Sequence, residues 1–311
     1  MTIKTVLVGA RGYVGSELIS ILSQHASIEL IAASSRELEG KTVQQYTKSK
    51  LTYGNLTPED VAELSADLVI LALPNGLASQ FVESLEQKRG GATIIDLSAD
   101  YRFKEGWSYS LPEIYQPQTM TRISNPGCYA TAMQLSIAPV KNLVQGRVSC
   151  FGISGYSGAG TTPSDKNNTE LLNNNVMPYS LANHLHEKEV SHHLSMDIKF
   201  SPHVAEYFRG ITLTSHIPLK RPLSLTDIKS CYEDFYQKST LIKVQEPPPQ
   251  IRQVSNTFDV IIGGFELSPD GQHLAVSCAL DNLLKGAASQ AVQNINIAFE
   301  LPQLEGLKQG R

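Results

Sequence analysis

Three glycines between a predicted strand and a predicted helix constrain the fold of this chain more than any other feature. The segment Gly9-Ala10-Arg11-Gly12-Tyr13-Val14-Gly15 follows the apolar run Ile3–Val8 and leads into Val14–Leu22, where apolar residues recur at helical spacing. Glycines let the backbone turn sharply, and a helix N-terminus offers unpaired N–H groups to a phosphate. The pattern therefore predicts a dinucleotide-binding turn, with a ligand-free glycine turn as the alternative. Its candidate binding residues are Gly9, Arg11, Gly12, Tyr13, Val14 and Gly15.

The alternation of strand and helix continues through the first 127 residues. Ile28–Ala33, Leu68–Leu73 and Thr93–Leu97 are apolar runs of strand length, and Leu77–Leu85 has the pattern of an amphipathic helix. Strands that alternate with helices form parallel sheets with crossover helices. We therefore expect an α/β fold whose first domain, residues 1–127, is built on a Rossmann-type parallel sheet.

The rest of the chain has a different pattern. Strand signals separated by long polar loops occur at Val148–Ile153, Ile198–Phe200, Ile211–Ile217 and Phe258–Phe265. A capping sequence at Ser224 opens a helix that runs to about Tyr236. These signals predict an α+β catalytic domain, residues 128–281, with a largely antiparallel sheet. A last helix, about Asn282 to Phe299, is mostly small and apolar, and the C-terminal segment 282–311 is expected to complete the first domain.

Composition excludes several classes of protein. The 311 residues carry a formal charge of −4 with no basic stripe, so no nucleic acid partner is expected. No apolar stretch is long enough to span a bilayer, so no membrane association is expected either. The four cysteines fall at irregular intervals that fit neither a disulfide framework nor a zinc site, which indicates a reducing cytoplasm. Cys150, Cys231 and Cys278 lie within apolar patterns and are expected to be buried structural residues.

The end of the second predicted strand indicates which dinucleotide binds. An NAD enzyme usually carries an acidic residue there for the ribose hydroxyls, whereas this chain has Ser34-Ser35-Arg36. Hydroxyls and a guanidinium suit a 2′-phosphate, so NADP is the expected cofactor. Glu37 and Glu39 follow closely, which leaves a solvated loop as the alternative.

Cys128 stands apart from the other cysteines. It follows a Pro-Gly turn and begins a predicted helix that runs through Ile137, before Pro139. N–H groups at a helix N-terminus stabilise a thiolate and lower its pKa from the reference value near 8.5. Cys128 is therefore the predicted nucleophile.

Four motifs occur in order along the chain: the glycine turn, Ser124-Asn125-Pro126-Gly127-Cys128-Tyr129-Ala130-Thr131, Ser154-Gly155-Tyr156-Ser157-Gly158-Ala159-Gly160 and Asp281-Asn282-Leu283-Leu284-Lys285-Gly286-Ala287-Ala288. With them the chain resembles the N-acetyl-γ-glutamyl-phosphate reductases, type 1-like, of the aspartate-semialdehyde dehydrogenase superfamily. The resemblance implies a two-domain fold, a cysteine nucleophile, NADPH and a place in arginine biosynthesis. The chain departs from the usual pattern at Ala130, Thr161 and Lys188, where proline, arginine and proline are common.

The resemblance also implies an acid–base histidine. The family's His-x-His-x-x-Glu element corresponds to His184, His186 and Glu189, of which His184 is favoured as the acid–base group and Glu189 as the residue that orients it. A metal site is the competing interpretation, because His192 and His193 lie nearby. The segment fails the H-E-x-x-H pattern, however, and no metal is expected.

Substrate and cofactor residues complete the predicted site. Arg102 lies beyond the fourth predicted strand and is a candidate for the leaving phosphate, and Arg209 is a candidate for the substrate carboxylate, where a planar guanidinium binds bidentately. An exposed salt bridge is the alternative for each arginine. Lys285 is expected to be a helix-surface charge. The remaining assignments are Asn125 for substrate binding and Pro74, Ser157, Gly158 and Asn282 for cofactor binding.

Together these features predict NADPH-dependent reduction of N-acetyl-γ-glutamyl phosphate to the semialdehyde and phosphate through a thioester on Cys128. Aspartyl or aminoadipyl phosphate is an alternative substrate, because the shape of the pocket decides the acyl group. An alternative from another class is a non-catalytic NADP-binding sensor. The expected partners are a small-molecule acyl phosphate and further copies of the chain, in a homodimer or homotetramer.

Overall fold

The computed structural model describes residues 2–88, 91–115 and 120–307. The chain divides into two compact units. One contains the residues up to Gly127 together with the segment that starts at Ala287, and the other runs from Cys128 to Gly286. No helix among the described residues is long and apolar enough to cross a membrane.

The first unit is built on a seven-stranded sheet whose described pairings are all parallel. In sheet order the strands are β3 (Tyr53–Gly54), β2 (Ile28–Ser34), β1 (Ile3–Val8), β4 (Leu68–Leu71), β5 (Thr93–Asp96), β7 (Arg122–Ser124) and β6 (Ser108–Tyr109). Leucine, isoleucine and valine fill β1, β4 and β5, as expected for strands that are covered on both faces. The predicted Rossmann-type parallel sheet is confirmed.

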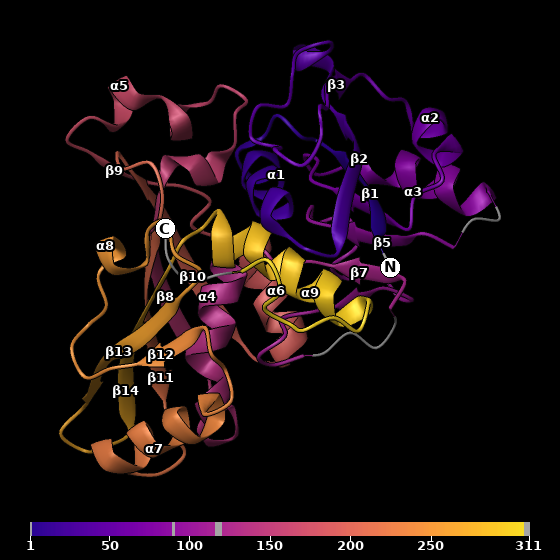
Figure 1. The fold of residues 1–311 in the computed structure, drawn as a ribbon. Helices are drawn as coiled ribbons and strands as arrows, with labels where there is room; N and C mark the ends of the chain where they lie inside the picture. Colours follow the sequence, from indigo (N-terminus) through magenta and orange to yellow (C-terminus); the bar gives the residue numbers. More distant parts are fainter. Residues whose placement is uncertain (1, 89–90, 116–119, 308–311) are drawn as a thin grey trace. The chain divides into compact units, whose positions relative to one another are not determined.

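Helices cover both faces of this sheet (Figure 1). They are α1 (Tyr13–Gln24), α2 (Pro58–Glu63), α3 (Ala78–Gln87), α9 (Ser289–Ala298) and the short 3-10 helix η1 (Arg36–Leu38). The helices α2 and α3 pack Val61, Val82 and Leu85 onto Val6 and Val69 of the strands, while α1 and α9 lie on the opposite face.

The second unit contains a mixed, seven-stranded sheet. In sheet order its strands are β12 (Ile242–Val244), β13 (Val260–Leu267), β14 (His273–Leu280), β11 (Ile211–Pro218), β8 (Val148–Gly155), β10 (Ile198–Ala205) and β9 (Val176–Pro178). The pairings β12–β13 and β8–β10 are parallel, and the other four are antiparallel. The predicted, largely antiparallel sheet is therefore confirmed.

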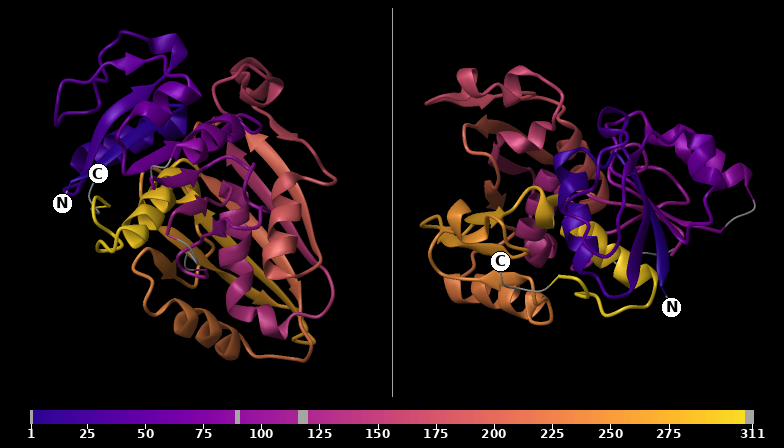
Figure 2. Two further views of the ribbon diagram at one scale, coloured as in Figure 1. Left: turned by 90° about the vertical axis from the view of Figure 1, so that its right-hand side faces the viewer. Right: turned by 45° about the horizontal axis from the view of Figure 1, so that its top comes forward.

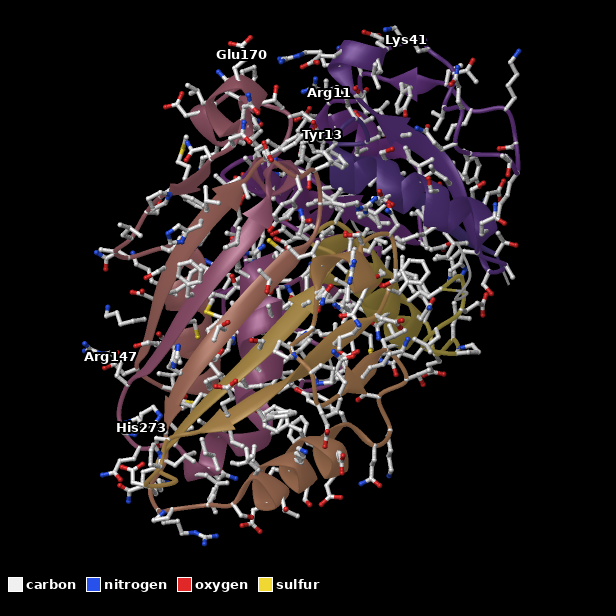
Figure 3. The ribbon with its side chains drawn as sticks, turned by 90° about the vertical axis from the view of Figure 1, so that its left-hand side faces the viewer. Arg11, Tyr13, Lys41, Arg147, Glu170 and His273 are labelled. Carbon is white, nitrogen blue, oxygen red and sulfur yellow. The ribbon has the colours of Figure 1, made fainter. Side chains whose placement is uncertain are left out.

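Only one face of this second sheet is fully covered. Along β8, Val148, Cys150 and Gly152 are buried, whereas Ser149 and Phe151 between them are exposed. This alternation is typical of a sheet with one face on the core and one face free. The covered face, towards the viewer in Figure 2 (left), packs on helices, and Figure 3 looks onto the other face. The helices of this unit are α4 (Cys128–Ile137), α5 (Thr169–Leu172), α6 (Leu185–Leu194), α7 (Leu225–Tyr236) and α8 (Ile251–Val254), with 3-10 helices η2 (Ala138–Leu143), η3 (Tyr156–Ala159) and η4 (Asp165–Asn167).

The structure corrects the sequence interpretation of the last helix. The helix begins at Leu284 rather than Asn282, its first turn is a π-helix, η5 (Leu284–Ala288), and α9 ends at Ala298. The rest of the segment 282–311 forms turns as far as Leu307, and residues 308–311 lie outside the described part of the chain. Lys285 was expected at the helix surface, but its exposed fraction is 0%.

A smaller correction concerns Cys231. It was expected to be buried, but it is only partly buried, because α7 turns Ile228, Tyr232 and Tyr236 towards the core and leaves Cys231 at the side.

Candidate active site

The glycine turn of the first unit owes its shape to Gly9 and Gly15. Gly9 has a φ of +85°, and a Cβ there would lie 2.1 Å from the carbonyl oxygen of Ala72. A Cβ on Gly15 would lie 2.5 Å from the carbonyl oxygen of Gly9. Only glycine therefore lets the strand end, the turn and α1 approach one another this closely.

Gly12 differs from these two glycines and supports the predicted cofactor. A Cβ on Gly12 would meet only the Gly9 carbonyl oxygen, at 3.5 Å, so its protein neighbours leave room for a side chain. Gly12 is the N-cap of α1 and offers no side chain to the first N–H groups of the helix, and Tyr13 and Val14 begin its first turn. An uncapped helix N-terminus beside open space fits a pyrophosphate. The residues present therefore fit a bound dinucleotide.

We expect Gly12→Ala to weaken NADPH binding without unfolding the protein. The backbone of Gly12 has φ −58° and ψ 158°, which alanine adopts readily, so the thermal midpoint should stay close to that of the wild type. The added methyl group would lie where the pyrophosphate approaches, so the KM for NADPH should rise at least about tenfold. Gly9→Ala is the contrasting variant, because its methyl group would strike Ala72 and lower the thermal midpoint. Unchanged cofactor binding in a folded Gly12→Ala protein would contradict the assignment.

The residues expected to select NADP lie at the end of β2. The hydroxyl oxygen of Ser34 accepts the N–H of Leu56 (3.1 Å), and that of Ser35 accepts the N–H of Leu38 (3.3 Å) and so caps η1. Both serines are buried, and the side chain of Arg36 is exposed beside them. Glu37 forms an ion pair with Arg11 of the glycine turn, which Figure 3 labels. Because Glu37 is paired, the loop presents Arg36 as an exposed cation.

In the first unit, Arg102 on the loop after β5 is hydrogen-bonded to Asn125, which directly follows β7. Arg102 is buried, and it donates from Nε to the carbonyl oxygen of Asn125 (3.0 Å) and from Nη2 to that of Leu97 (3.1 Å). The side chain of Asn125 donates to the carbonyl oxygen of Ala287 (3.2 Å) and accepts from Asn294 (3.0 Å). These hydrogen bonds fix the backbone just before the Pro-Gly turn.

Pro74 follows β4 and is exposed. The loop that contains it is joined to the loop after β5, because Asp100 accepts the N–H groups of Gly76 (2.7 Å) and Ala78 (3.1 Å) and so caps α3. Burial raises the pKa of the neighbouring Asp96 to about 6, against the hydrogen bonds of Ser98 that favour its anion. The two hydrogen bonds of Asp100 therefore join the loop after β4 to the loop after β5.

Cys128 is the first residue of α4 in the second unit, as predicted, and it is partly exposed. The buried thiols differ from it, since burial raises the pKa of Cys150 and that of Cys278 to about 12. Those two thiols stay protonated at neutral pH and are inert. Cys128 alone combines a helix N-terminus with access to solvent among the cysteines.

Aromatic rings connect Cys128 to the predicted histidines. Tyr129, the next residue, is buried and donates from its hydroxyl to the carbonyl oxygen of His203 (2.6 Å). Its ring centroid lies 6.5 Å from that of His184 and 6.2 Å from that of His186. The structure therefore brings Cys128, His184 and His186 into one cluster.

Tyr179 also belongs to this cluster, although no sequence motif predicts a role for it. Its ring centroid lies 5.6 Å from that of His184, and its hydroxyl shares a hydrogen bond with Tyr129. Burial and then the nearby charge of Cys128 raise the pKa of Tyr179. Only the fold brings it to the nucleophile.

His184 is held in one tautomer by its position before α6. It is the N-cap of this helix, and its Nδ1 accepts the backbone N–H of His186 (3.1 Å), so a neutral ring carries its proton on Nε2. The pKa of His184 is lowered to about 4, first by burial and then by the cation of Lys166, while the charge of Glu187 acts in the opposite direction. Glu189 lies further along α6 and is fully buried, while Glu187 accepts the N–H of Phe200 (2.9 Å) and fixes the helix to β10.

We expect the imidazole of His184 to stay neutral throughout the pH range from 6 to 8. Its folded pKa of about 4 lies below the unfolded value of 6.5, so the unfolded chain binds a proton first as the pH falls. His184 therefore lowers the free energy of unfolding as the pH falls from about 6.5 to about 4, and it has no such effect above this window. NMR titration of the ring protons should show a midpoint near 4.

His184→Asn is the matched variant, because asparagine retains the cap on the N–H of His186 but does not titrate. It should remove this part of the pH dependence of stability. A midpoint near the ordinary histidine value in the wild type would contradict the geometry.

A second cluster in this unit surrounds Asp281. The Nε atom of Arg209 lies 2.7 Å from its Oδ2, and Arg209 Nη2 donates to its Oδ1 (3.1 Å). Asp281 also accepts the N–H groups of Leu283 (2.9 Å), Leu284 (3.2 Å) and Asn256 (2.7 Å), so it begins η5 and anchors two loops. The sequence predicted no role for Asp281, which is the first residue of the motif Asp281–Ala288.

Asn282 extends this cluster to the Ser-Gly-Ala-Gly loop. Its side chain accepts the N–H of Gly210 (2.6 Å) and donates to the hydroxyl of Ser157 (2.9 Å). A Cβ on Gly158 would lie 3.0 Å from the hydroxyl oxygen of Ser154, so this loop packs closely on β8. Hydrogen bonds through Asp281 and Gly210 therefore join the predicted residues Arg209, Asn282 and Ser157, and Gly158 packs beside them.

Gly286 connects this assembly to the nucleophile. Its N–H donates to the carbonyl oxygen of Asp281 (2.9 Å), and a Cβ on it would lie 2.8 Å from the Cβ of Cys128. The turn η5 therefore packs directly against Cys128 through Gly286, and only glycine fits at the contact. Among the described residues, no group of three or more His, Cys, Asp or Glu side chains is arranged to hold a metal ion.

Family models match both units of the chain. Residues 4–122 match the family model described as semialdehyde dehydrogenase, NAD binding domain, and residues 128–282 match semialdehyde dehydrogenase, dimerisation domain. The chain is 50% identical over 307 residues to an N-acetyl-gamma-glutamyl-phosphate reductase of Xylella fastidiosa, with 97% of this chain and 94% of the relative covered. It is 48% identical to a reductase of the same name from Xanthomonas axonopodis pv. citri, with 98% of each chain covered.

Solved structures are similar in fold. Aspartate semialdehyde dehydrogenase II from Vibrio cholerae superposes with a TM-score of 0.81 at 16% identity, covering 96% of this chain and 99% of the other. The Candida albicans aspartate semialdehyde dehydrogenase with NADP superposes with a TM-score of 0.72 at 15% identity, covering 95% and 100%. At these identities the likeness supports the two-domain α/β fold and nothing finer.

Proposed function

Because the chain belongs to the N-acetyl-gamma-glutamyl-phosphate reductase family of semialdehyde dehydrogenases, we propose that it reduces N-acetyl-γ-glutamyl phosphate to the semialdehyde in arginine biosynthesis. The observation that carries the proposal is Cys128 at the N-terminus of α4 in one cluster with His184 and His186. Aspartyl phosphate is less well supported, since the aspartate enzymes share only the fold with this chain.

Cys128 performs the covalent step. Its thiolate attacks the acyl carbon, a carbon–sulfur bond forms, and the bond to the phosphate oxygen breaks with its electron pair leaving on phosphate. NADPH, when bound, supplies the hydride that reduces the thioester. The hemithioacetal on Cys128 then collapses, releases the aldehyde and returns the electron pair of the carbon–sulfur bond to sulfur.

The two histidines take different parts in this scheme. His184 is neutral with its proton on Nε2, so it donates a hydrogen bond to the oxyanion that develops on the acyl oxygen. A pKa near 4 is poorly matched to proton transfer at neutral pH, which favours His186 as the group that protonates the departing phosphate. We infer that Glu189, which is buried on α6, orients the histidine pair.

The remaining roles follow the two units. The first unit is the NADP-binding domain, with the turn from Gly9 to Gly15 at the pyrophosphate and Arg36 at the 2′-phosphate. The second unit is the catalytic domain. In it, Arg209, which is held by its ion pair with Asp281, binds the substrate carboxylate.

The open face of the second sheet supports a homodimer. Phe151 and His203 lie on it with ring centroids 4.5 Å apart, and Phe151 is 43% exposed. An isologous pairing would cover this face with its own copy, which fits the dimerisation domain matched by residues 128–282. We place the enzyme in the cytoplasm, where its thiol stays reduced.

The function is tested by initial rates of NADP⁺ reduction with N-acetylglutamate semialdehyde and phosphate, with aspartate semialdehyde in parallel. Activity with the first aldehyde is expected. Activity with only the second would move the assignment to the aspartate enzymes. NADPH binding without turnover of either aldehyde would favour a sensor that has lost the reaction.

A further inference from the structure

Lys166 lies on a loop that its own neighbours hold in place. It is the middle residue of η4, just after the Ser-Gly-Ala-Gly loop. The next residue, Asn167, donates from Nδ2 to the carbonyl oxygens of Gly160 (3.0 Å) and Thr162 (2.8 Å). Asn167 also accepts the N–H of Ser164 (2.8 Å), which closes a capping box. The position of the Lys166 backbone is therefore set relative to the loop.

The side chain of Lys166 extends to the cluster around Cys128. Its Nζ lies 5.0 Å from the centroid of the Tyr179 ring, within reach of a cation–π interaction. The same ring contacts His184 and shares a hydrogen bond with Tyr129, the residue after the nucleophile. The positive charge also acts on His184, whose pKa it lowers after burial has done so. The ammonium group thus lies beside the aromatic cluster that contains Tyr179 and His184.

Among the described residues, no acidic side chain forms an ion pair with Lys166, although Lys166 is half-buried. Lys199, Lys229 and Lys243 of the same unit each pair with an Asp or Glu. A half-buried cation beside Tyr179 and His184, with no carboxylate paired to it among the described residues, is suited to an anionic substrate group.

We propose that Lys166 binds the phosphoryl group of the acyl phosphate, and inorganic phosphate in the reverse reaction. The inference rests on the proposed function. Lys166 lies in η4 just beyond the Ser-Gly-Ala-Gly loop, and the hydrogen bond from Asn167 to the carbonyl oxygen of Gly160 joins η4 to that loop. Lysine binds phosphate as a compact point charge, so a position over the Tyr179 ring suffices without a planar fork.

The test is the phosphate dependence of NADP⁺ reduction at saturating semialdehyde. Lys166→Met keeps the apolar stem and removes the charge, so kcat/KM for inorganic phosphate should fall about 10- to 100-fold. The KM values for the semialdehyde and for NADP⁺ should stay unchanged. Lys166→Arg should restore most of the phosphate dependence, and Lys166→Gln serves as a second charge-removing variant if the methionine protein is unstable.

Lys199→Met is the matched control. It removes an exposed lysine of the same unit that already pairs with Glu187, so its phosphate kinetics should equal those of the wild type. The proposal is overturned if Lys166→Met and Lys166→Gln leave the phosphate dependence unchanged, or if the rise in KM falls on NADP⁺ or the semialdehyde instead. A wild-type protein inactive in both directions would refute the proposed function itself, which separates the two failures.

Discussion

Cys128→Ser is expected to lower kcat at least about 1,000-fold, because removal of a covalent nucleophile costs several powers of ten. A serine hydroxyl has almost the same shape, so the Gly286 contact and the start of α4 should persist. Its proton is far more tightly held than that of a thiol at a helix N-terminus, so the attack on the acyl carbon fails. NADPH binding should remain, since the glycine turn is untouched.

Two measurements check this result. Initial rates in both directions give kcat, and mass spectrometry of the wild type mixed with the acyl phosphate, without NADPH, should detect an acyl adduct on the Cys128 peptide. Cys231→Ser is the control, because Cys231 is partly buried on α7, away from the Cys128 cluster. A folded Cys128→Ser protein with wild-type turnover would falsify the thioester mechanism.

Apolar periodicity and capping patterns predicted much of the fold, because contacts between neighbouring residues determine where many helices and strands begin and end. The strand Ile3–Val8 and the helix Cys128–Ile137 have the predicted bounds. The Ser224 capping box also forms: the N–H of Asp227 donates to the Ser224 hydroxyl (3.1 Å), and the N–H of Ser224 donates to the Asp227 carboxylate (3.1 Å). Each of these elements begins or ends through contacts between residues within a few positions of one another. Periodicity and capping patterns report on such contacts.

The prediction for Lys285 failed for a definite reason. Lys285 was expected on the helix surface because charged side chains are seldom fully buried. The structure buries Lys285 in η5 and also buries every residue of α9 from Ser289 to Asn296, so the helix has no exposed face over this length. The buried polar residues Asn294 and Asn296 of α9 pair with Ser110 and His25, which are distant in the sequence, so no local pattern predicts their burial.

The residues that complete the candidate site depend on long-range contacts. Tyr179 is 50 residues from Tyr129 in sequence, and Asp281 is 72 residues from Arg209, so no local pattern predicts either pairing. Cys128, His184 and His186 were found because motifs and a family resemblance carry them.

Asp281→Asn is expected to have the second large effect, on stability and on substrate binding together. The exposed fraction of Asp281 is 0% and that of the Arg209 side chain is 13%, so the change leaves a nearly buried guanidinium without its counter-charge. Removal of one partner from a buried ion pair costs about 3 kcal/mol in the free energy of unfolding. Chemical denaturation measures this loss. Arg209 also loses the carboxylate that aims it, so the KM for the semialdehyde should rise.

Two further variants separate these effects. Asp259→Asn is the matched control, because Asp259 pairs with the half-exposed Lys243 and its loss should cost no more than about 1 kcal/mol. In the double variant Asp281→Asn with Arg209→Met the unpaired charge is gone, so stability should recover relative to Asp281→Asn alone, whereas carboxylate binding should not. If the free energy of unfolding falls equally for Asp281→Asn and Asp259→Asn, burial of the Arg209–Asp281 ion pair does not determine how much the pair contributes to stability. If the KM for the semialdehyde recovers in the double variant, Arg209 does not bind the substrate carboxylate.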